Sequence, residues 1–91
     1  MADSYSYPLD FSWSAREMAT VIAFFNHVEA FYEKPKSVSA DSFLSAYKAF
    51  KTVVPSLSAE KKLARDFENA SSYSIYNAVQ AVKLTQKSKM V

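Results

Sequence analysis

Glycine and cysteine are both absent from this 91-residue chain. Without glycine, the chain can contain neither a glycine-rich phosphate loop nor a dinucleotide-binding fingerprint, and its helices must end without the residue that most often follows a helix in the left-handed conformation. Without cysteine, disulfides, thiolate catalysis and zinc–thiolate sites are excluded. This composition favours a reducing cytoplasm as the location of the protein.

Long apolar runs are missing as well. No apolar stretch approaches the ~18 residues that a membrane-spanning helix needs. The first residues, "MADSYSYPLD", carry acids where a signal peptide has a basic and then an apolar region. We therefore expect a cytoplasmic protein that makes no membrane contact.

Apolar and aromatic residues are plentiful, at 49% and 15% of the chain. This content is enough for one core in a single domain of this length. Charge is unevenly placed: one basic and five acidic residues give residues 1–33 a net charge of −4, and ten basic and four acidic residues give residues 34–91 a net charge of +6. We favour mutual neutralisation within the fold over attraction of an acidic partner such as nucleic acid.

The first predicted helix spans about residues 15–33. Ser14 and Glu17 match the capping-box pattern, and apolar side chains recur at helical spacing over about half of the circumference. So wide an apolar face predicts a central helix that several other elements contact. Pro35 then ends the helix, because the residue before a proline avoids the helical region.

Three further helices are predicted over about residues 40–53, 59–69 and 75–84. Pro55 separates the first two of these, and the small polar residues of "NASSYS" precede the last. The expected caps, in order, are Ser39 or Asp41, Ser58, and Ser72 or Ser74. Residues 85–91 are expected to form a frayed basic tail.

Residues 4–13, "SYSYPLDFSW", alternate strictly between apolar and polar side chains. This pattern is typical of a half-buried strand, yet the helices offer no second strand for pairing. We therefore expect an extended arm, residues 1–13, whose alternate side chains enter a groove between the helices. The side chains expected to do so are Tyr5, Tyr7, Leu9, Phe11 and Trp13. The alternative is a homodimer in which the arm packs on a second copy.

The expected fold is all-α, with four helices in a compact bundle-like array over residues 14–84 and the arm laid across it. The residues expected in its core are Phe25, Val28, Tyr32, Tyr47, Phe50, Phe67 and Val79.

Several longer segments resemble a known family: "YSYPLDFSWSAREM", "FFNHVEAFYEK", "AYKAFKTVVPS" and "EKKLARDFENASSYSIYNAV". In order and spacing they are similar to the small uncharacterised YktA-like family of Bacillus-type bacteria, over roughly residues 4–84. Ser72 departs from the family, which often has glycine there. The resemblance implies an all-helical cytosolic domain and supplies no catalytic residues.

Residues for catalysis or metal binding are few. His27 is the only histidine and is expected at the surface, away from the apolar stripe. Glu29 and Glu33 share a helix face, but two carboxylates without histidine make a weak metal site. We expect Glu29 to form a structural pair with a lysine or a tyrosine hydroxyl, and Glu29 and Glu33 are also candidates for contact with a partner. The chain is thus predicted not to be an enzyme and to need no metal or cofactor.

The predicted function is that of a small non-catalytic cytosolic interaction or regulatory protein with an unidentified protein partner. The alternative is a weak nucleic-acid binder that uses Lys61, Lys62, Arg65 and the C-terminal lysines. The simpler interpretation of these basic residues is a solvated helix face. Tyr73 and Tyr76 are expected to lie in the core, although such rings can also stack on bases.

Overall fold

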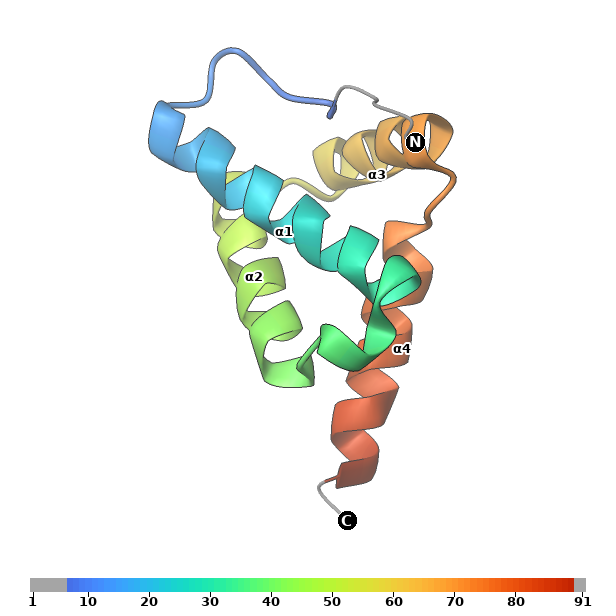
Figure 1. Cartoon of the computed structure of the whole chain (residues 1–91). Coiled ribbons are helices and arrows are strands. Elements are labelled where there is room, and N and C mark those ends of the chain that lie inside the picture. Colours follow the sequence, from blue (N-terminus) through green and yellow to red (C-terminus); the bar gives the residue numbers. More distant parts are fainter. Residues whose placement is uncertain (1–6, 90–91) are drawn as a thin grey trace.

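The computed structural model describes the backbone of residues 7–89 and the side chains of residues 7–85. The described chain contains four α-helices and no strand, so the predicted all-α fold is confirmed (Figure 1). The helices are α1 (Ala15–Glu33), α2 (Ala40–Val53), α3 (Leu57–Ser71) and α4 (Ile75–Lys89), with a short 3-10 helix, η1 (Pro35–Ser37), before α2. None of these helices combines the length and apolarity that crossing a membrane requires.

Helix α1 lies at the centre of the fold and crosses the others (Figure 1). Its start is fixed by the predicted capping box: the Glu17 amide donates to Ser14 Oγ over 3.1 Å, and the Ser14 amide donates to Glu17 Oε1 over 2.8 Å. Its buried face consists of Val21, Phe24, Phe25 and Val28.

Two adjacent phenylalanines of α1 pack against two different helices. The Phe24 ring packs against α2, with its centroid 4.7 Å from that of Phe50 and 5.7 Å from that of Phe43. The Phe25 ring stacks on Phe67 of α3, at 4.7 Å between centroids and 18° between planes. Because side chains 100° apart on a helix point in different directions, this pair lets α1 hold α2 on one side and α3 on another.

Bulky rings separate α1 from α3. No Cα atom of α3 lies within 8 Å of a Cα atom of α1, whereas α1 and α2 approach one another along their length. The space between α1 and α3 is filled by the rings of Phe25 and Phe67 and by Tyr7 of the arm. The spacing of α3 from α1 therefore depends on these three side chains.

The expected core is largely buried. Phe25, Val28, Phe50 and Phe67 have no exposed surface, and Val79 is 4% exposed. Tyr47 is half-buried, and Tyr32 lies at the edge of the core with 36% of its surface exposed. Tyrosine can take such edge positions because its hydroxyl reaches a polar partner while its ring packs.

Helix α3 extends beyond its predicted range of 59–69 at both ends. Its cap is Ser56 and not Ser58, since Ser56 Oγ accepts from the Ala59 amide over 3.3 Å. At its other end, Ser71 Oγ donates to the Phe67 carbonyl over 2.7 Å. Ser71 thus bonds back onto its own helix and remains helical, and the break begins at Ser72.

Helix α4 also extends beyond its prediction of 75–84. Its cap is Ser74, whose Oγ accepts from the Asn77 amide over 3.1 Å. The helix continues to Lys89, so residues 85–89 do not form the expected frayed tail. No proline or glycine follows Leu84, and Thr85 Oγ1 donates to the Ala81 carbonyl over 3.1 Å. Nothing in this sequence therefore stops the helix.

Ser72 ends α3 in the left-handed conformation, with φ 72° and ψ 10°. It is the only described residue other than glycine with a positive φ. A side chain with a Cβ atom is strained here by roughly 1–2 kcal/mol. The tight turn expected of a glycine at this position thus forms with serine.

We predict that Ser72→Gly stabilises the protein by about 0.5–1 kcal/mol, because glycine removes the Cβ strain at some cost in chain entropy. Urea denaturation measures the change. The matched control is Ser71→Gly, one residue earlier inside the helix, which should destabilise by about 1 kcal/mol. A loss of stability in both variants would contradict the assigned turn.

Candidate functional site

Residues 7–13, the part of the arm that the structure describes, cross the fold near α1 and α3. Tyr7, Leu9 and Trp13 are half-buried and pack against the core. The Tyr7 ring lies 5.3 Å from that of Phe25 and 6.2 Å from that of Phe67, centroid to centroid. These arm residues therefore pack on their own chain, as the favoured alternative predicted; Tyr5 lies outside the described residues.

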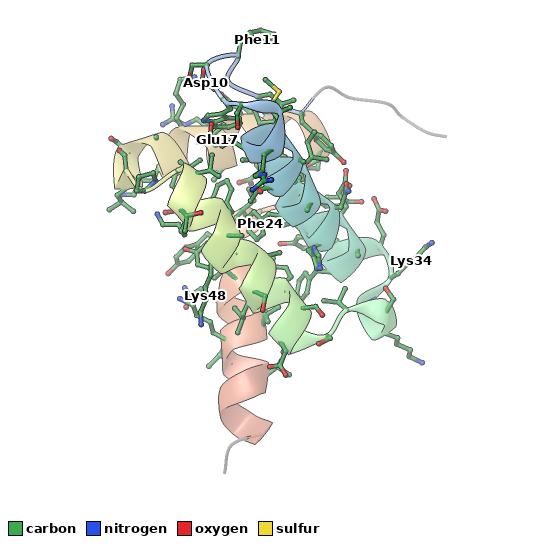
Figure 2. All side chains as sticks on the ribbon, turned by 90° about the vertical axis from the view of Figure 1, so that its left-hand side faces the viewer. Asp10, Phe11, Glu17, Phe24, Lys34 and Lys48 are labelled. Carbon is green, nitrogen blue, oxygen red and sulfur yellow. The ribbon has the colours of Figure 1, made fainter. Side chains whose placement is uncertain are left out.

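Phe11 contradicts the predicted alternation, because 92% of its surface is exposed. The cause is a turn at Asp10. The Trp13 amide donates to the Asp10 carbonyl over 3.0 Å, and the Ser12 amide donates to Asp10 Oδ1 over 2.9 Å. A turn of this kind interrupts the two-residue period of an extended chain. Figure 2 shows Phe11 at the outer end of the molecule, pointing away from the helices.

The turn at Asp10 is stabilised by the charge of the Asp10 carboxylate. The hydrogen bond from the Ser12 amide stabilises the ionised carboxylate and lowers the pKa of Asp10. The turn therefore persists at neutral pH and holds Phe11 outward. The sequence carries a signal for it, since aspartate followed two residues later by serine, "DFS", is typical of an Asx turn.

A groove of about 480 Å³ lies between the arm and the α2–α3 junction. Its apolar lining includes Pro8, Leu9, Trp13, Val53, Ala59 and Leu63, and Phe11 itself is part of the lining. Charged residues of both signs, Asp10, Lys62 and Asp66, also line it. The groove has the size of a small-ligand or side-chain pocket, for which ~300–1,000 Å³ is usual.

A second cluster joins tyrosines to the carboxylates of α1. Tyr7 Oη lies 2.8 Å from Glu29 Oε1, so the predicted pairing of Glu29 with a tyrosine is present. Tyr73 Oη donates to Glu33 Oε2 over 2.6 Å. The Tyr73 ring stacks on Tyr32 at 4.8 Å and 8°, and Tyr32 Oη donates to the Ser74 carbonyl over 2.7 Å.

The Tyr7 hydroxyl is also 2.8 Å from Asn26 Oδ1. A phenol has a single proton, and the anionic Glu29 is the stronger acceptor. The Asn26 amide, turned so that its nitrogen faces Tyr7, would donate to the same oxygen. This arrangement ties the arm to the middle of α1.

Each hydroxyl in this cluster remains protonated well above neutral pH. Burial, followed by the hydrogen bond to Glu29, raises the pKa of Tyr7 far above its ordinary value. Burial also raises the pKa of Tyr32, and the bond to Glu33 raises that of Tyr73. These phenols therefore serve as hydrogen-bond donors and are poor bases or nucleophiles at pH 7.

A third polar group links α2 to α3. Glu60 accepts from Tyr47 Oη over 3.0 Å and forms an ion pair with Lys51. Burial and the Glu60 carboxylate raise the pKa of Tyr47 to about 12. Lys83 of α4 places its ammonium 5.7 Å from the centre of the Tyr47 ring, a cation–π contact.

The predicted interaction residues do not form one surface. Glu29, Glu33 and Tyr73 gather in the tyrosine cluster. Tyr76 is 68% exposed, so its predicted core position is wrong. It lies on the part of α4 that faces solvent, while Ile75, Ala78 and Val79 face the core.

The basic residues Lys61, Lys62 and Arg65 are exposed on α3, as expected of a solvated face. Lys62 pairs with Asp66 over 3.2 Å.

His27 is less exposed than predicted. Its ring meets Phe43 edge-on at 6.4 Å, and its Nδ1 lies 2.8 Å from the Ala23 carbonyl oxygen. Segment η1 and the start of α2 cover this side of α1, so the face opposite the main stripe is also partly packed. Among residues with described side chains, no three histidines, cysteines or acids gather as a metal site.

A family model described as "Uncharacterised protein family (UPF0223)" matches residues 4–91. The chain belongs to this family. It is 56% identical over 90 residues to a UPF0223 protein of Streptococcus pneumoniae strain CGSP14, covering 99% of this chain and 96% of that protein. It is 55% identical over 83 residues to the UPF0223 protein of Streptococcus sanguinis strain SK36, covering 91% and 88%. No solved structure matches the chain. The predicted membership of an uncharacterised family is thus confirmed, and UPF0223 transfers no activity to the site.

We predict that Trp13→Ala and Phe11→Ala differ sharply in this UPF0223 protein. Trp13 is half-buried and precedes the cap of α1, so its truncation should cost about 2 kcal/mol. Phe11 is exposed, and its truncation should change the free energy of unfolding by less than about 0.5 kcal/mol. Urea denaturation at low protein concentration compares the two. Equal losses in the free energy of unfolding for the two variants would mean that the arm does not pack as described.

We also predict a loss of stability in alkali. A tyrosine in an unfolded chain has a pKa of about 10, and Tyr47 has one of about 12 in the fold. Between these values the unfolded chain loses a proton that the folded protein keeps, so this stabilisation is complete below pH ~10 and disappears towards pH ~12. Tyr47→Phe should reduce the alkaline loss, measured by urea midpoints. The exposed control Tyr76→Phe should leave the loss intact, and identical curves for wild type and Tyr47→Phe would contradict the prediction.

Proposed function

We propose that this UPF0223 member is a non-catalytic protein-interaction domain of the cytoplasm, and that its contact surface is Phe11 together with the adjoining groove. The observation that carries the proposal is the outward placement of Phe11. The ring is 92% exposed, and it is positioned by a turn in which the backbone amides of Ser12 and Trp13 donate to Asp10. A partner that presents an apolar side chain beside charges of both signs would fit this surface.

A single exposed apolar residue is ordinary on protein surfaces. Phe11 differs from such a residue in its surroundings, because it stands beside a groove lined by Leu9, Trp13 and Leu63. An exposed aromatic ring next to an apolar depression is the arrangement found at the centres of protein interfaces. Burying the ring would remove apolar area from water without distorting the fold.

The chemistry of the polar groups supports a non-catalytic role. The phenols of Tyr7, Tyr47 and Tyr73 have raised pKa values and donate to carboxylates. The Nδ1 atom of His27 is engaged with the Ala23 carbonyl. Each group thus has a structural partner that accounts for its presence, and no nucleophile–base pair is needed to explain it.

The nucleic-acid alternative has less support. Binding to phosphates requires several free cations on one face. Lys51 is bound by Glu60, and Lys62 by Asp66. Helix α3 itself carries three acids beside its three bases, which weakens its positive field. The narrower assignment to a YktA-like type of Bacillus-type bacteria is likewise a proposal, which the residue resemblance supports.

A photoreactive benzoylphenylalanine placed at residue 11 tests the proposed surface in living cells. We expect a covalent protein adduct after irradiation, because the ring is exposed where a partner would bind. The matched control is the same residue at position 76, another exposed aromatic site, where adducts should be rare.

Equal labelling at the two positions, or none at residue 11, would contradict the proposal. An adduct that nuclease removes would favour the nucleic-acid alternative instead.

A further inference from the structure

We propose that the partner of the Phe11 surface is a second copy of this chain, and that each copy inserts its Phe11 into the groove of the other. The inference deepens the proposed function and rests on it. It depends on three features of the described residues: where the ring lies relative to the groove, which charges line the groove, and how much area the exchange would bury.

The ring and the groove lie side by side on one surface. Phe11 belongs to the groove's own lining, and so does Asp10, which holds the ring outward. When a projection and its receptor adjoin, a two-fold axis between two copies can place both projections in both receptors at once. The contact then closes at two subunits. A projection and a receptor on opposite faces would instead generate open chains.

The groove carries charges of both signs, so the same surface on a second copy can offer it opposite charges. Asp10 and Asp66 are acidic and Lys62 is basic. A two-fold axis brings Asp10, next to the inserted ring, towards Lys62 of the other copy. Lys62 and Asp66 are exposed by 75% and 41% in their present pair, so exchanging this partner costs little. A strongly acidic or basic partner would leave one sign unmatched.

The buried area predicts a weak dimer. An aromatic side chain buries ~150–250 Å², so two inserted rings and the walls that they cover remove roughly 600–1,000 Å² from water. Stable interfaces bury about 1,200–2,000 Å². The self-association should therefore be concentration-dependent, in the micromolar to millimolar range of dissociation constants, and not obligate.

Sedimentation velocity of the purified full chain, from about 5 μM to about 1 mM, is the first test. We expect a monomer–dimer equilibrium in the wild type and at least a tenfold weaker dimer in Phe11→Asp. The control Tyr76→Asp, also at an exposed ring, should dimerise as the wild type does. A monomer throughout the range, or a dimer unchanged by Phe11→Asp, would overturn the inference.

The turn supplies a second pair of variants. Asp10→Ala removes the acceptor that orients Phe11, while Ser12→Ala keeps the larger hydrogen bond, from the Ser12 amide, and loses only the smaller contribution of the Ser12 side chain. Asp10→Ala should weaken the dimer several-fold, and Ser12→Ala should weaken it clearly less. Equal dimerisation of these two variants would show that the presentation of Phe11 is unimportant.

Photocrosslinking identifies the contact. Benzoylphenylalanine at residue 11, in a mixture of ¹⁴N- and ¹⁵N-labelled chains, should give mixed-isotope adducts to residues 57–71. If every adduct joined two residues of the same chain, so that no adduct contained both isotopes, the dimer would be overturned. In cells, an adduct that contains only this chain supports the inference. An adduct only with other proteins overturns the dimer and leaves the proposed function intact, and no adduct overturns both.

Discussion

The contact between α1 and α3 is made by aromatic rings, and the rest of the structure depends on it. The two backbones stay more than 8 Å apart between Cα atoms, and Phe25, Phe67 and Tyr7 fill the space. Phe24, the neighbour of Phe25, packs its ring against Phe43 and Phe50 of α2, where the two backbones also approach one another closely. The chain thus obtains much of its core from layers of rings, which bury much area per residue.

This arrangement makes the arm part of the fold. Tyr7 completes the ring cluster and bonds to Glu29 on α1, which holds the first described residue of the arm in place. Trp13 and the capping box of α1 hold the last residues of the arm. Between the two, the Asp10 turn projects Phe11 into solvent. The residue with the clearest potential for binding is therefore presented by a segment that the core holds at both sides.

Much of the fold could be predicted from the sequence, because prolines, caps and apolar periodicity act locally. The Ser14–Glu17 box and the wide apolar face of α1 are examples. Phe11 could not be placed by alternation alone, since a hydrogen bond from the Ser12 amide to Asp10 overrode the strand-like period. Helix α3 begins earlier than expected because Ser56 and not Ser58 is its cap, and the hydroxyls of Ser71 and Thr85 bond back onto their own helices where an end was expected. The groove joins segments distant in sequence, and no local pattern predicts such a site.

A double-mutant cycle between Tyr7→Leu and Phe67→Leu tests the central claim most directly, because these residues belong to the arm and to α3. The free energies of unfolding come from urea denaturation of the wild type, both single variants and the double variant. If the rings join arm and helix, the two losses should be coupled by about 0.5–1.5 kcal/mol, as aromatic pairs in contact are. Losses that add to within about 0.3 kcal/mol would show that the residues act independently, and would contradict the account.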